Sequence, residues 1–571
     1  MNKKLKQLRH SAAHILAKAV KELYPEVKLG IGPAIRYGFY YDFDSPKPIK
    51  DQDLEKIEEK MKEIIRKDEK FIKKEIRLNE AMEIFKDEPY KLELLKNIEN
   101  ETVKVYKTGE FVDLCKGPHI KSAKKINPRA LKLKRIAGAY WKGDEKNKML
   151  TRIYGLLFSK EKKLKNHLKL IKEAKKRDHR KLGPKLDLFS FHSEAPGMPF
   201  LHSNGLIIFN ELVSHWRKIQ AKYDYHEVKL PNLLNVELWK KSGHYEHYQD
   251  NMFFTKNDKK EMALRPMDCP GAILLYQEKI RSYSELPLRI SELGTVFRNE
   301  KSGELHGLFR VQQITQDDAH IFLTAKKIEI EVSKILKIVK EIYQPFSMKK
   351  RFFLSTKPKD AMGDDETWKK AEGALKNALE KNDIHYGIKK GDGAFYGPKI
   401  DLQMRDSMDR TWQMGTIQLD FFMPRRFKIK YINKHNEKKT PVIIHRCLMG
   451  ALERFIGILT EHYAGAFPFW LSPVQVILIP VSGEKNMDYC MKVKGKLEAR
   501  NIRAKIDKSL QSVSKRICSA EVQRIPYILV IGDKEEKSQI VSIRKRGNEK
   551  IRERKLEEFR EILVNKIKNK D

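Results

Sequence analysis

A lysine-rich segment with helical periodicity, residues 159–186, divides this sequence of 571 residues, which is too long for one hydrophobic core. Its apolar residues recur every three or four positions, and Gly183-Pro184 marks its end. Strand-like and helical stretches alternate before it, and a strand-rich stretch follows it. The last part opens with VQVILIPV, a pattern typical of a strand buried on both faces. We therefore predict an α+β multidomain protein with an α+β domain at 1–158, a connector helix at 159–186, a strand-rich domain at 187–471 and an α/β domain at 472–571.

The formal net charge of +39 favours a polyanionic partner, and nucleic acid is the partner that it suits best. A compositional bias toward lysine without any partner is the alternative. No apolar run approaches the ~20 residues of a membrane span. The N-terminus lacks an apolar core followed by a cleavage site, and the five cysteines are too scattered for a disulfide framework. These features predict a cytoplasmic protein without a membrane partner.

Two pairs of potential ligands occur in the first domain. His10 and His14 lie four residues apart, on a face of a predicted helix that carries Lys18 and points away from its apolar stripe. Cys115 and His119 have the same spacing around a Gly-Pro turn. Spacing alone leaves three interpretations open: surface polar residues, a tetrahedral metal site, or a metal-free hydrolytic or RNA-end pocket.

Four segments of this domain resemble the editing domain shared by threonyl- and alanyl-tRNA synthetases. They are the HxxxH helix, GPAIRYGFYYDFD, DLCKGPH and AGAYWKGDEKNKMLTRIYG. The resemblance implies a pocket that hydrolyses the ester of a wrongly attached amino acid without a bound metal. Arg36 and Tyr37 stand where the family has an acidic residue and Asn. The residues implied to line the pocket are His10, His14, Cys115 and His119, with Tyr41, Asp113 and Lys91 nearby.

Two segments of the strand-rich domain carry arginines suited to phosphate. Residues 297–322 are strand-like at both ends and flank a loop with Arg298, Glu300 and Arg310, which could bring two guanidinium groups onto a triphosphate. A solvated hairpin with a few charges is the alternative. In MGALERFIGILTEHYAG, Arg454 interrupts an apolar helix and needs a partner, either a nucleotide phosphate or a carboxylate such as Glu453 or Glu461.

Residues 297–322 resemble motif 2 of class II aminoacyl-tRNA synthetases, and MGALERFIGILTEHYAG resembles motif 3. The helix in GLIIFNELVSHWRKIQAKYDYHEVKLP resembles motif 1. The resemblance implies an antiparallel catalytic sheet that binds ATP with Mg²⁺ and catalyses by positioning and electrostatics. Arg298 would contact the α-phosphate, Arg454 the γ-phosphate, and Glu300 and Arg310 the nucleotide. The motif 1 helix suits a homodimer interface as readily as a core.

Cys269, His320 and His445 lie far apart in the sequence, and each alone is more often structural than a metal ligand. The resemblance to threonyl-tRNA synthetases spans essentially the whole chain, and it implies that these three residues bind one catalytic Zn²⁺ per subunit. An apolar pocket separates threonine from isosteric valine poorly, whereas zinc bound by the amino and hydroxyl groups would reject valine. Serine keeps the hydroxyl, so mischarged Ser-tRNA(Thr) is expected, and the editing domain would remove it.

The same resemblance assigns further residues to substrates. It places His244 near acyl transfer to the tRNA, although a loop histidine without a role is equally compatible with the sequence. The last domain resembles the α/β anticodon-binding domain of the family, with Leu510, Gln511 and Ser512 in place of the usual Asn-Glu-Lys. The implied residues are Gln316, Asp318, Tyr396, Lys399, Thr416 and Gln418 at the threonine and adenylate, and Arg524, Glu535 and Arg544 at the anticodon.

The sequence thus predicts a threonine–tRNA ligase whose partners are tRNA(Thr), threonine and ATP. The small N-terminal domain that precedes the editing domain in many family members is expected to be missing. A class II synthetase for another amino acid, which would lack the active-site zinc, is one alternative. A non-catalytic RNA-binding relative is the other.

Overall fold

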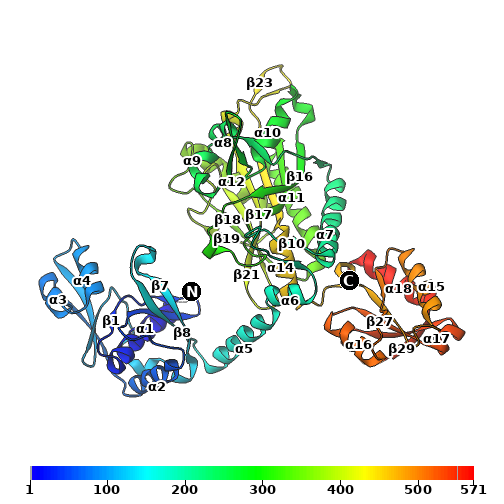
Figure 1. The fold of residues 1–571 in the computed structure, drawn as a ribbon. Helices are drawn as coiled ribbons and strands as arrows, with labels where there is room; N and C mark the ends of the chain where they lie inside the picture. The colour runs from blue at the N-terminus through cyan, green and yellow to red at the C-terminus, as the bar shows by residue number, and fades with distance from the viewer. Residues whose placement is uncertain (1–2, 549–550) are drawn as a thin grey trace. The chain divides into compact units, whose positions relative to one another are not determined.

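The computed structural model describes residues 3–548 and 551–571, which form two compact units, Met1–Lys172 and Glu173–Asp571 (Figure 1). Each unit has its own hydrophobic core. The domain boundaries expected at 158, 186 and 471 stay predictions. Among the described residues, no helix is long and apolar enough to cross a membrane.

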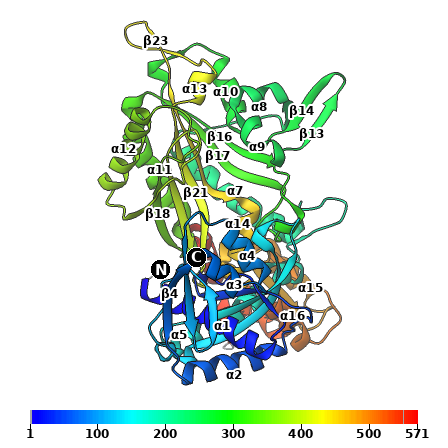
Figure 2. The same cartoon turned by 90° about the vertical axis from the view of Figure 1, so that its left-hand side faces the viewer.

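The first unit contains two antiparallel sheets, and its helix α1 (Lys3–Leu23) packs against the larger sheet and against α2 (Asp53–Arg66) (Figure 2). Both α1 and α2 contribute apolar side chains to the core. The smaller helices are α3 (Leu78–Ile84) and α4 (Pro89–Lys96). The larger sheet contains β1 (Lys28–Leu29), β2 (Ala34–Ile35), β3 (Gly38–Asp44), β7 (Leu131–Tyr140) and β8 (Met149–Leu157), and the smaller contains β4 (Phe71–Arg77), β5 (Thr102–Thr108) and β6 (Phe111–Leu114).

The prediction that α1 has a polar face pointing away from the core is wrong. The helix is buried from Ser11 to Val20, because α2 and the larger sheet pack against it and Phe71 and Tyr106 of the smaller sheet join the same core. Lys18, expected on the exposed face, is 5% exposed, forms an ion pair with Glu69 and donates to the carbonyl of Thr108 at 3.1 Å. The helix is therefore a central one, and its histidines lie inside the unit.

The predicted connector helix is two helices, α5 (Glu161–Arg177) and α6 (His179–Lys185). The chain breaks at Asp178, whose backbone leaves the helical region and whose carboxylate accepts a hydrogen bond from the N–H of Arg180. Such N-capping favours the start of a new helix. Gly183 and Pro184 lie within α6, which ends one residue later.

The second unit is built on an eight-stranded sheet in the order β11-β16-β17-β24-β21-β20-β18-β19. Its strands are antiparallel, except that β11 pairs with β16 and β18 with β19 in parallel. Three small sheets accompany it, β10-β9, β12-β14-β13 and β15-β22-β23. The strands of these four sheets are β9 (Phe189–Ser190), β10 (Phe200–Leu201), β11 (His226–Glu227), β12 (Leu233–Asn235), β13 (Phe254–Asn257), β14 (Lys260–Leu264), β15 (Arg281–Ser282), β16 (Leu288–Phe297), β17 (Gln313–Leu323), β18 (Lys349–Ser355), β19 (Tyr386–Lys389), β20 (Lys399–Arg405), β21 (Thr411–Asp420), β22 (Tyr431–Ile432), β23 (Lys438–Lys439) and β24 (Val442–Ala451).

Helices cover one face of this sheet, and the alternation of side chains along each strand decides which residues meet them. Ala319 and Ile321 of β17, Ile444 of β24 and Ile417 of β21 enter a core formed with α7, α11, α12 and α14. The residues between them point to the opposite face. The helices around this sheet are α7 (Ser203–Lys222), α8 (Val236–Ser242), α9 (His244–Tyr248), α10 (Cys269–Gln277), α11 (Ile328–Tyr343), α12 (Asp365–Lys381), α13 (Met423–Arg426) and α14 (Leu452–His462).

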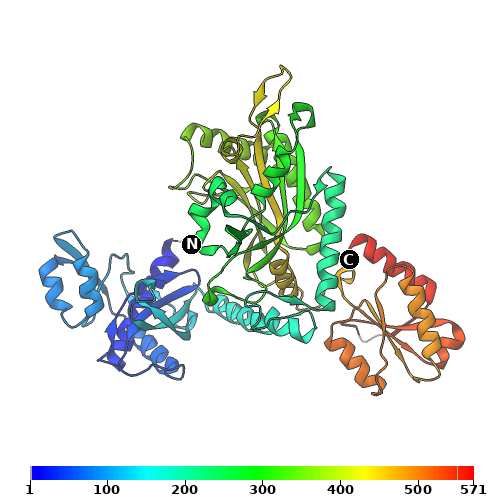
Figure 3. The same ribbon diagram turned by 45° about the horizontal axis from the view of Figure 1, so that its top comes forward.

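The C-terminal part of this unit is a five-stranded sheet in the order β26-β25-β27-β28-β29, with helices on both faces (Figure 3). The strand predicted from VQVILIPV is β25, which is fully buried and pairs in parallel with β26 and β27. The elements are β25 (Val476–Pro480), α15 (Met487–Glu498), β26 (Ala504–Ile506), α16 (Val513–Val522), β27 (Tyr527–Ile531), α17 (Asp533–Ser538), β28 (Ile540–Lys545), β29 (Ile551–Lys555) and α18 (Leu556–Asn569).

Candidate functional site

Three neighbouring strands of the large sheet direct polar side chains toward one cavity. His320 of β17 lies opposite His445 of β24, and His445 lies opposite Gln418 of β21. Asp318, Cys447 and Thr416 form the next row on the same face. These side chains line a cavity of about 610 Å³. All six residues predicted to contact the threonine and adenylate line it, namely Gln316, Asp318, Tyr396, Lys399, Thr416 and Gln418.

Cys269, His320 and His445 converge in this cavity. Their potential ligand atoms all lie within 4.8 Å of one another, and the two imidazole rings are 4.9 Å apart and nearly perpendicular. Cys269 reaches the site because it is the first residue of α10, whereas the two histidines come from the sheet. All three side chains are more than nine-tenths buried. Burial raises the pKa of the Cys269 thiol and lowers the pKa of His320.

A second cavity of about 300 Å³ contains the three arginines of the predicted ATP site, Arg298, Arg310 and Arg454, together with Glu300. Arg298 lines both cavities. Arg310 forms ion pairs with Glu300 at 2.7 Å and Glu304 at 2.6 Å. The pKa of Arg454 is lowered by burial and by the neighbouring Arg310 and Arg298.

Neither Glu453 nor Glu461, the two carboxylates considered as partners of Arg454, pairs with it. Both oxygens of Glu453 accept from the N–H of Thr315, and Glu461 contacts His179 and Arg410. Arg454 instead donates through Nε to the carbonyl of Phe309 at 2.8 Å. A partly buried guanidinium beside two others is suited to a phosphate group.

His244 is not the loop histidine of the alternative interpretation. It begins α9, is fully buried, and places Nε2 3.7 Å from the sulfur of Cys269. It does not line the cavity, whereas His247 of the same helix does and stacks on Phe395. Sequence analysis missed His247, although its i, i+3 spacing from His244 in HYEH would have indicated a shared side of the helix. It also missed Asp420, whose Oδ2 lies 3.0 Å from Nε2 of His445.

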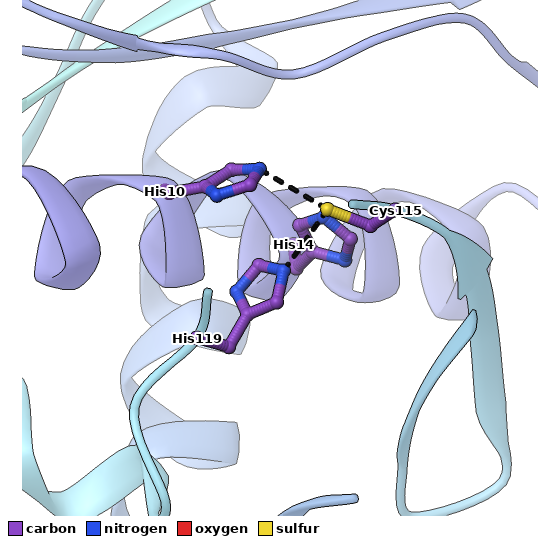
Figure 4. A group of neighbouring side chains, drawn as sticks. All are labelled: His10, His14, Cys115 and His119. Carbon is purple, nitrogen blue, oxygen red and sulfur yellow. Dashed lines mark hydrogen bonds between the residues drawn. The ribbon is translucent and has the colours of Figure 1, made fainter. Parts of the chain in front are cut away.

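The four predicted ligands of the first unit form a compact cluster (Figure 4). The sulfur of Cys115 lies 3.3 Å from Nε2 of His10 and 3.2 Å from Nε2 of His119, and the ring of His14 lies 4.2 Å from that of His119. His14 and His119 are buried, and His10 and Cys115 are partly buried. The interpretation as surface polar residues is therefore excluded.

Asp113 joins the remaining predicted residues to this cluster. It lies 3.3 Å from Nδ1 of His14, forms a 2.6 Å ion pair with Lys91, and accepts a 2.7 Å hydrogen bond from the hydroxyl of Tyr41. The pKa of His10, His14 and His119 is lowered, in each case chiefly by burial. Burial also raises the pKa of Cys115 to about 11. The histidines and the thiol of this cluster are thus neutral near pH 7.

Arg36 and Tyr37, which depart from the family pattern, pack near α5 and not against the histidine cluster. Tyr37 packs 4.6 Å from the ring of His167 in α5, and the guanidinium of Arg36 lies over Tyr37. They support the base of α5 and do not enter the histidine cluster.

The three residues predicted at the anticodon lie on different elements of the C-terminal domain: Arg524 after α16, Glu535 in α17 and Arg544 in β28. Arg544 pairs with Glu521 of α16 at 3.0 Å, and Arg524 follows that helix as an exposed residue. Glu535 accepts from the N–H of Gly532 and the hydroxyl of Ser542 at the start of α17. Glu535 therefore already has a structural role in capping that helix. Of the departing residues, Leu510 is fully exposed.

Comparisons with known proteins match family models to parts of the predicted editing, catalytic and anticodon-binding domains. Residues 252–463 match the class II tRNA synthetase core domain (G, H, P, S and T), residues 475–566 match the anticodon binding domain, and residues 103–154 match the second additional domain of threonyl and alanyl tRNA synthetases. A threonine–tRNA ligase from Acetivibrio thermocellus is 52% identical over 99% of this chain and 89% of its own length. The chain belongs to the threonyl-tRNA synthetase family.

Other threonyl-tRNA synthetases agree with this placement. The enzyme from Caldanaerobacter subterraneus subsp. tengcongensis is 50% identical over 98% of this chain and 87% of its own length. A crystal structure of the RNA binding domain of threonyl-tRNA synthetase from Cryptosporidium parvum covers 68% of this chain and 98% of its own, with 39% identity and a TM-score of 0.66. The predicted class II fold with editing and anticodon-binding domains is confirmed, and so is the prediction of an aminoacyl-tRNA ligase for threonine.

The histidine cluster makes the stability of the first unit depend on pH. Because the pKa of His14 and His119 lies below its unfolded value of about 6.5, the unfolded chain takes up protons below that pH and the folded chain does not. The free energy of unfolding should be fully present above pH 6.5 and fall by roughly 3 kcal/mol for the two histidines between pH 7.5 and 5.5.

Hydrogen exchange of the α1 amides, corrected for intrinsic rates, measures this effect. The amides of β27 are the control, because residues 472–571 contain no histidine. Equal protection of α1 at both pH values would contradict the pKa assignment.

Proposed function

We propose that this ligase joins threonine to tRNA(Thr) at the two adjoining cavities and removes serine at the histidine cluster. The observation that carries the proposal is the convergence of a thiol and two imidazoles from three distant segments, next to three arginines. Threonine would lie in the larger cavity and ATP, as its Mg²⁺ complex, in the smaller one.

The donor set of Cys269, His320 and His445 fits a Zn²⁺ ion. One sulfur and two imidazole nitrogens are typical zinc ligands, and three protein ligands leave a position open for substrate. Asp420 beside His445 is the kind of carboxylate partner that orients a ligating imidazole. Zinc held there would bind the amino and hydroxyl groups of threonine and so reject valine. We infer one Zn²⁺ per subunit.

The arginines divide between the two ends of the triphosphate. Arg298 lines both cavities, so it stands where the threonine carboxylate would meet the α-phosphate. Arg310 and Arg454 line only the nucleotide cavity, which suits contacts with the outer phosphates. In this arrangement the carboxylate attacks the α-phosphate, diphosphate leaves, and Arg298 stabilises the charge that develops. The tRNA 3′ hydroxyl then displaces AMP from the adenylate.

The editing reaction would use the neutral imidazoles of the first unit. Hydrolysis adds water across the ester of Ser-tRNA(Thr), releasing serine and the free 3′ hydroxyl. His10 and His14 are suited to accept a proton from the attacking water, because their lowered pKa keeps them unprotonated at pH 7. Lys91, held by Asp113 and Tyr41, supplies a positive charge beside the reacting ester.

The tRNA and a second copy of the chain are the remaining partners that we propose. The net charge of +39 suits tRNA, and Arg524 and Arg544 are suited to contact anticodon bases. We propose a homodimer formed through the catalytic domain, since Phe200 of β10 and Leu206 in the first turn of α7, the motif 1 helix, are almost half exposed. We also propose a cytoplasmic location, where the tRNA is found.

The zinc assignment predicts the effect of Cys269→Ser. The variant should lose bound zinc and reduce threonine-dependent ATP–diphosphate exchange roughly 100-fold or more, since even outer partners of a metal site are worth about 10–100-fold. Metal analysis and the exchange assay measure this. Cys518→Ser, at an exposed cysteine, is the matched control. Exchange that survives in Cys269→Ser without zinc would refute the assignment.

The editing assignment predicts that His10→Ala with His14→Ala lets Ser-tRNA(Thr) accumulate while threonine charging is unchanged. One missing methyl group lowers the rate of activation about 10–200-fold. At equal concentrations of the two amino acids, the double variant should therefore form one Ser-tRNA(Thr) for about every 10–200 Thr-tRNA(Thr). His167→Ala, at a histidine of the same unit outside the cluster, should not accumulate it. Because His14 is buried, Cys115→Ala serves as a second variant. Absence of Ser-tRNA(Thr) in both folded variants counts against editing at this cluster.

A further inference from the structure

A third group of potential ligands lies behind the nucleotide cavity, at Asp178, His179 and Glu461. His179 is the first residue of α6 and is fully buried. Its Nδ1 lies 2.7 Å from Oε1 of Glu461, and its backbone N–H donates to the same oxygen at 3.0 Å. The backbone N–H of Leu308 donates to its Nε2 at 3.0 Å.

These contacts fix the tautomer of His179. A backbone N–H can only donate, so Nε2 must present its lone pair and the ring proton must lie on Nδ1. That proton is directed at the carboxylate of Glu461. Both ring nitrogens are therefore occupied, and a metal ion at this group would have to displace one of the two hydrogen bonds.

The acceptor role of Nε2 matters because of what Leu308 and Phe309 do. Both residues line the nucleotide cavity, within the loop that carries Arg310. The carbonyl of Phe309 accepts from Nε of Arg454, and the ring of Phe309 lies 4.0 Å from that of His179. Two consecutive residues of the loop are thus held by hydrogen bonds, Leu308 by the imidazole and Phe309 by the arginine.

Gly307 provides the space for this contact. Its φ is +51°, and a Cβ atom at this position would overlap Nε2 of His179. The turn continues with hydrogen bonds from the N–H of Phe309 to the carbonyl of His306 and from the N–H of His306 to the carbonyl of Arg310. His179 therefore contacts the loop at the turn that sets the direction of Arg310.

We propose that His179 is a positioning residue for ATP, which holds the Arg310 loop and, through Phe309, the guanidinium of Arg454 in the geometry that binds the triphosphate. This inference rests on the proposed placement of ATP in the smaller cavity. His179 touches no substrate. Its contribution is the lone pair at Nε2, which keeps the N–H of Leu308 paired.

A pair of substitutions separates this role from general packing. In His179→Gln, the amide oxygen can reach the position of Nε2 and accept from Leu308. In His179→Asn, the shorter side chain can still donate to Glu461 but cannot reach Leu308. We expect His179→Asn to raise the KM for ATP about tenfold with the KM for threonine unchanged, and His179→Gln to stay within about threefold of the unaltered protein. His226→Asn, at an exposed histidine, is the matched control.

The ATP–diphosphate exchange assay provides the two KM values, and circular dichroism checks folding. Equal effects of the two variants, an unchanged KM for ATP in His179→Asn, or a parallel rise in the KM for threonine would each overturn the proposal. If His179→Asn does not fold, Gly307→Ala tests the same contact, and an unchanged KM for ATP there would also overturn it.

Calorimetric binding of ATP to the full chain keeps this proposal separate from the proposed function. If the unaltered protein shows no threonine-dependent exchange, the proposed function fails. The affinity of the His179 variants for ATP then still decides whether His179 positions the nucleotide loop.

Discussion

The register between β17, β24 and β21 is the constraint on which the catalytic unit depends. Because side chains alternate along a strand, pairing His320 with His445 and Asp318 with Cys447 places one set of residues in the cavity and the other in the helix-covered core. A slip of one residue would bury the polar set against the helices and expose Ile321 and Ile444. The burial of the apolar set therefore fixes the geometry of the polar residues that line the cavity.

Asp317 shows how the same sheet positions an arginine of the nucleotide cavity. Its Oδ1 accepts from the backbone N–H groups of Leu448, Met449 and Gly450 at 2.8 to 3.1 Å. These residues are the end of β24, immediately before α14 begins at Leu452. Satisfying the buried carboxylate with backbone donors fixes the strand-to-helix turn, and Arg454 follows in the first turn of that helix.

Much of this arrangement could be predicted from the sequence, but the predictable and unpredictable parts have different physical origins. Cys269, His320 and His445 could be grouped only through their resemblance to a family, because no local spacing joins ligands from α10, β17 and β24. The burial of Lys18 could not be foreseen, because an amphipathic pattern describes one helix and not what surrounds it. The break at Asp178 carried a local signal, an Asp before a new helix, that the continuing lysine periodicity obscured.

The two thiol and imidazole clusters differ most in their charged neighbours, and this difference separates their chemistry. Around Cys269, burial and the carboxylates of Asp318, Asp420 and Asp268 all raise the pKa of the thiol. Around Cys115, burial and Asp113 raise the pKa of the thiol, whereas Lys91 lowers it. The carboxylates near Cys269 favour a divalent cation, which would also stabilise its thiolate. Near Cys115 the single carboxylate is already paired with a lysine, so the charge balance there needs no cation. In the function proposed above, similar donor sets would thus serve zinc-dependent selection in one unit and metal-free hydrolysis in the other.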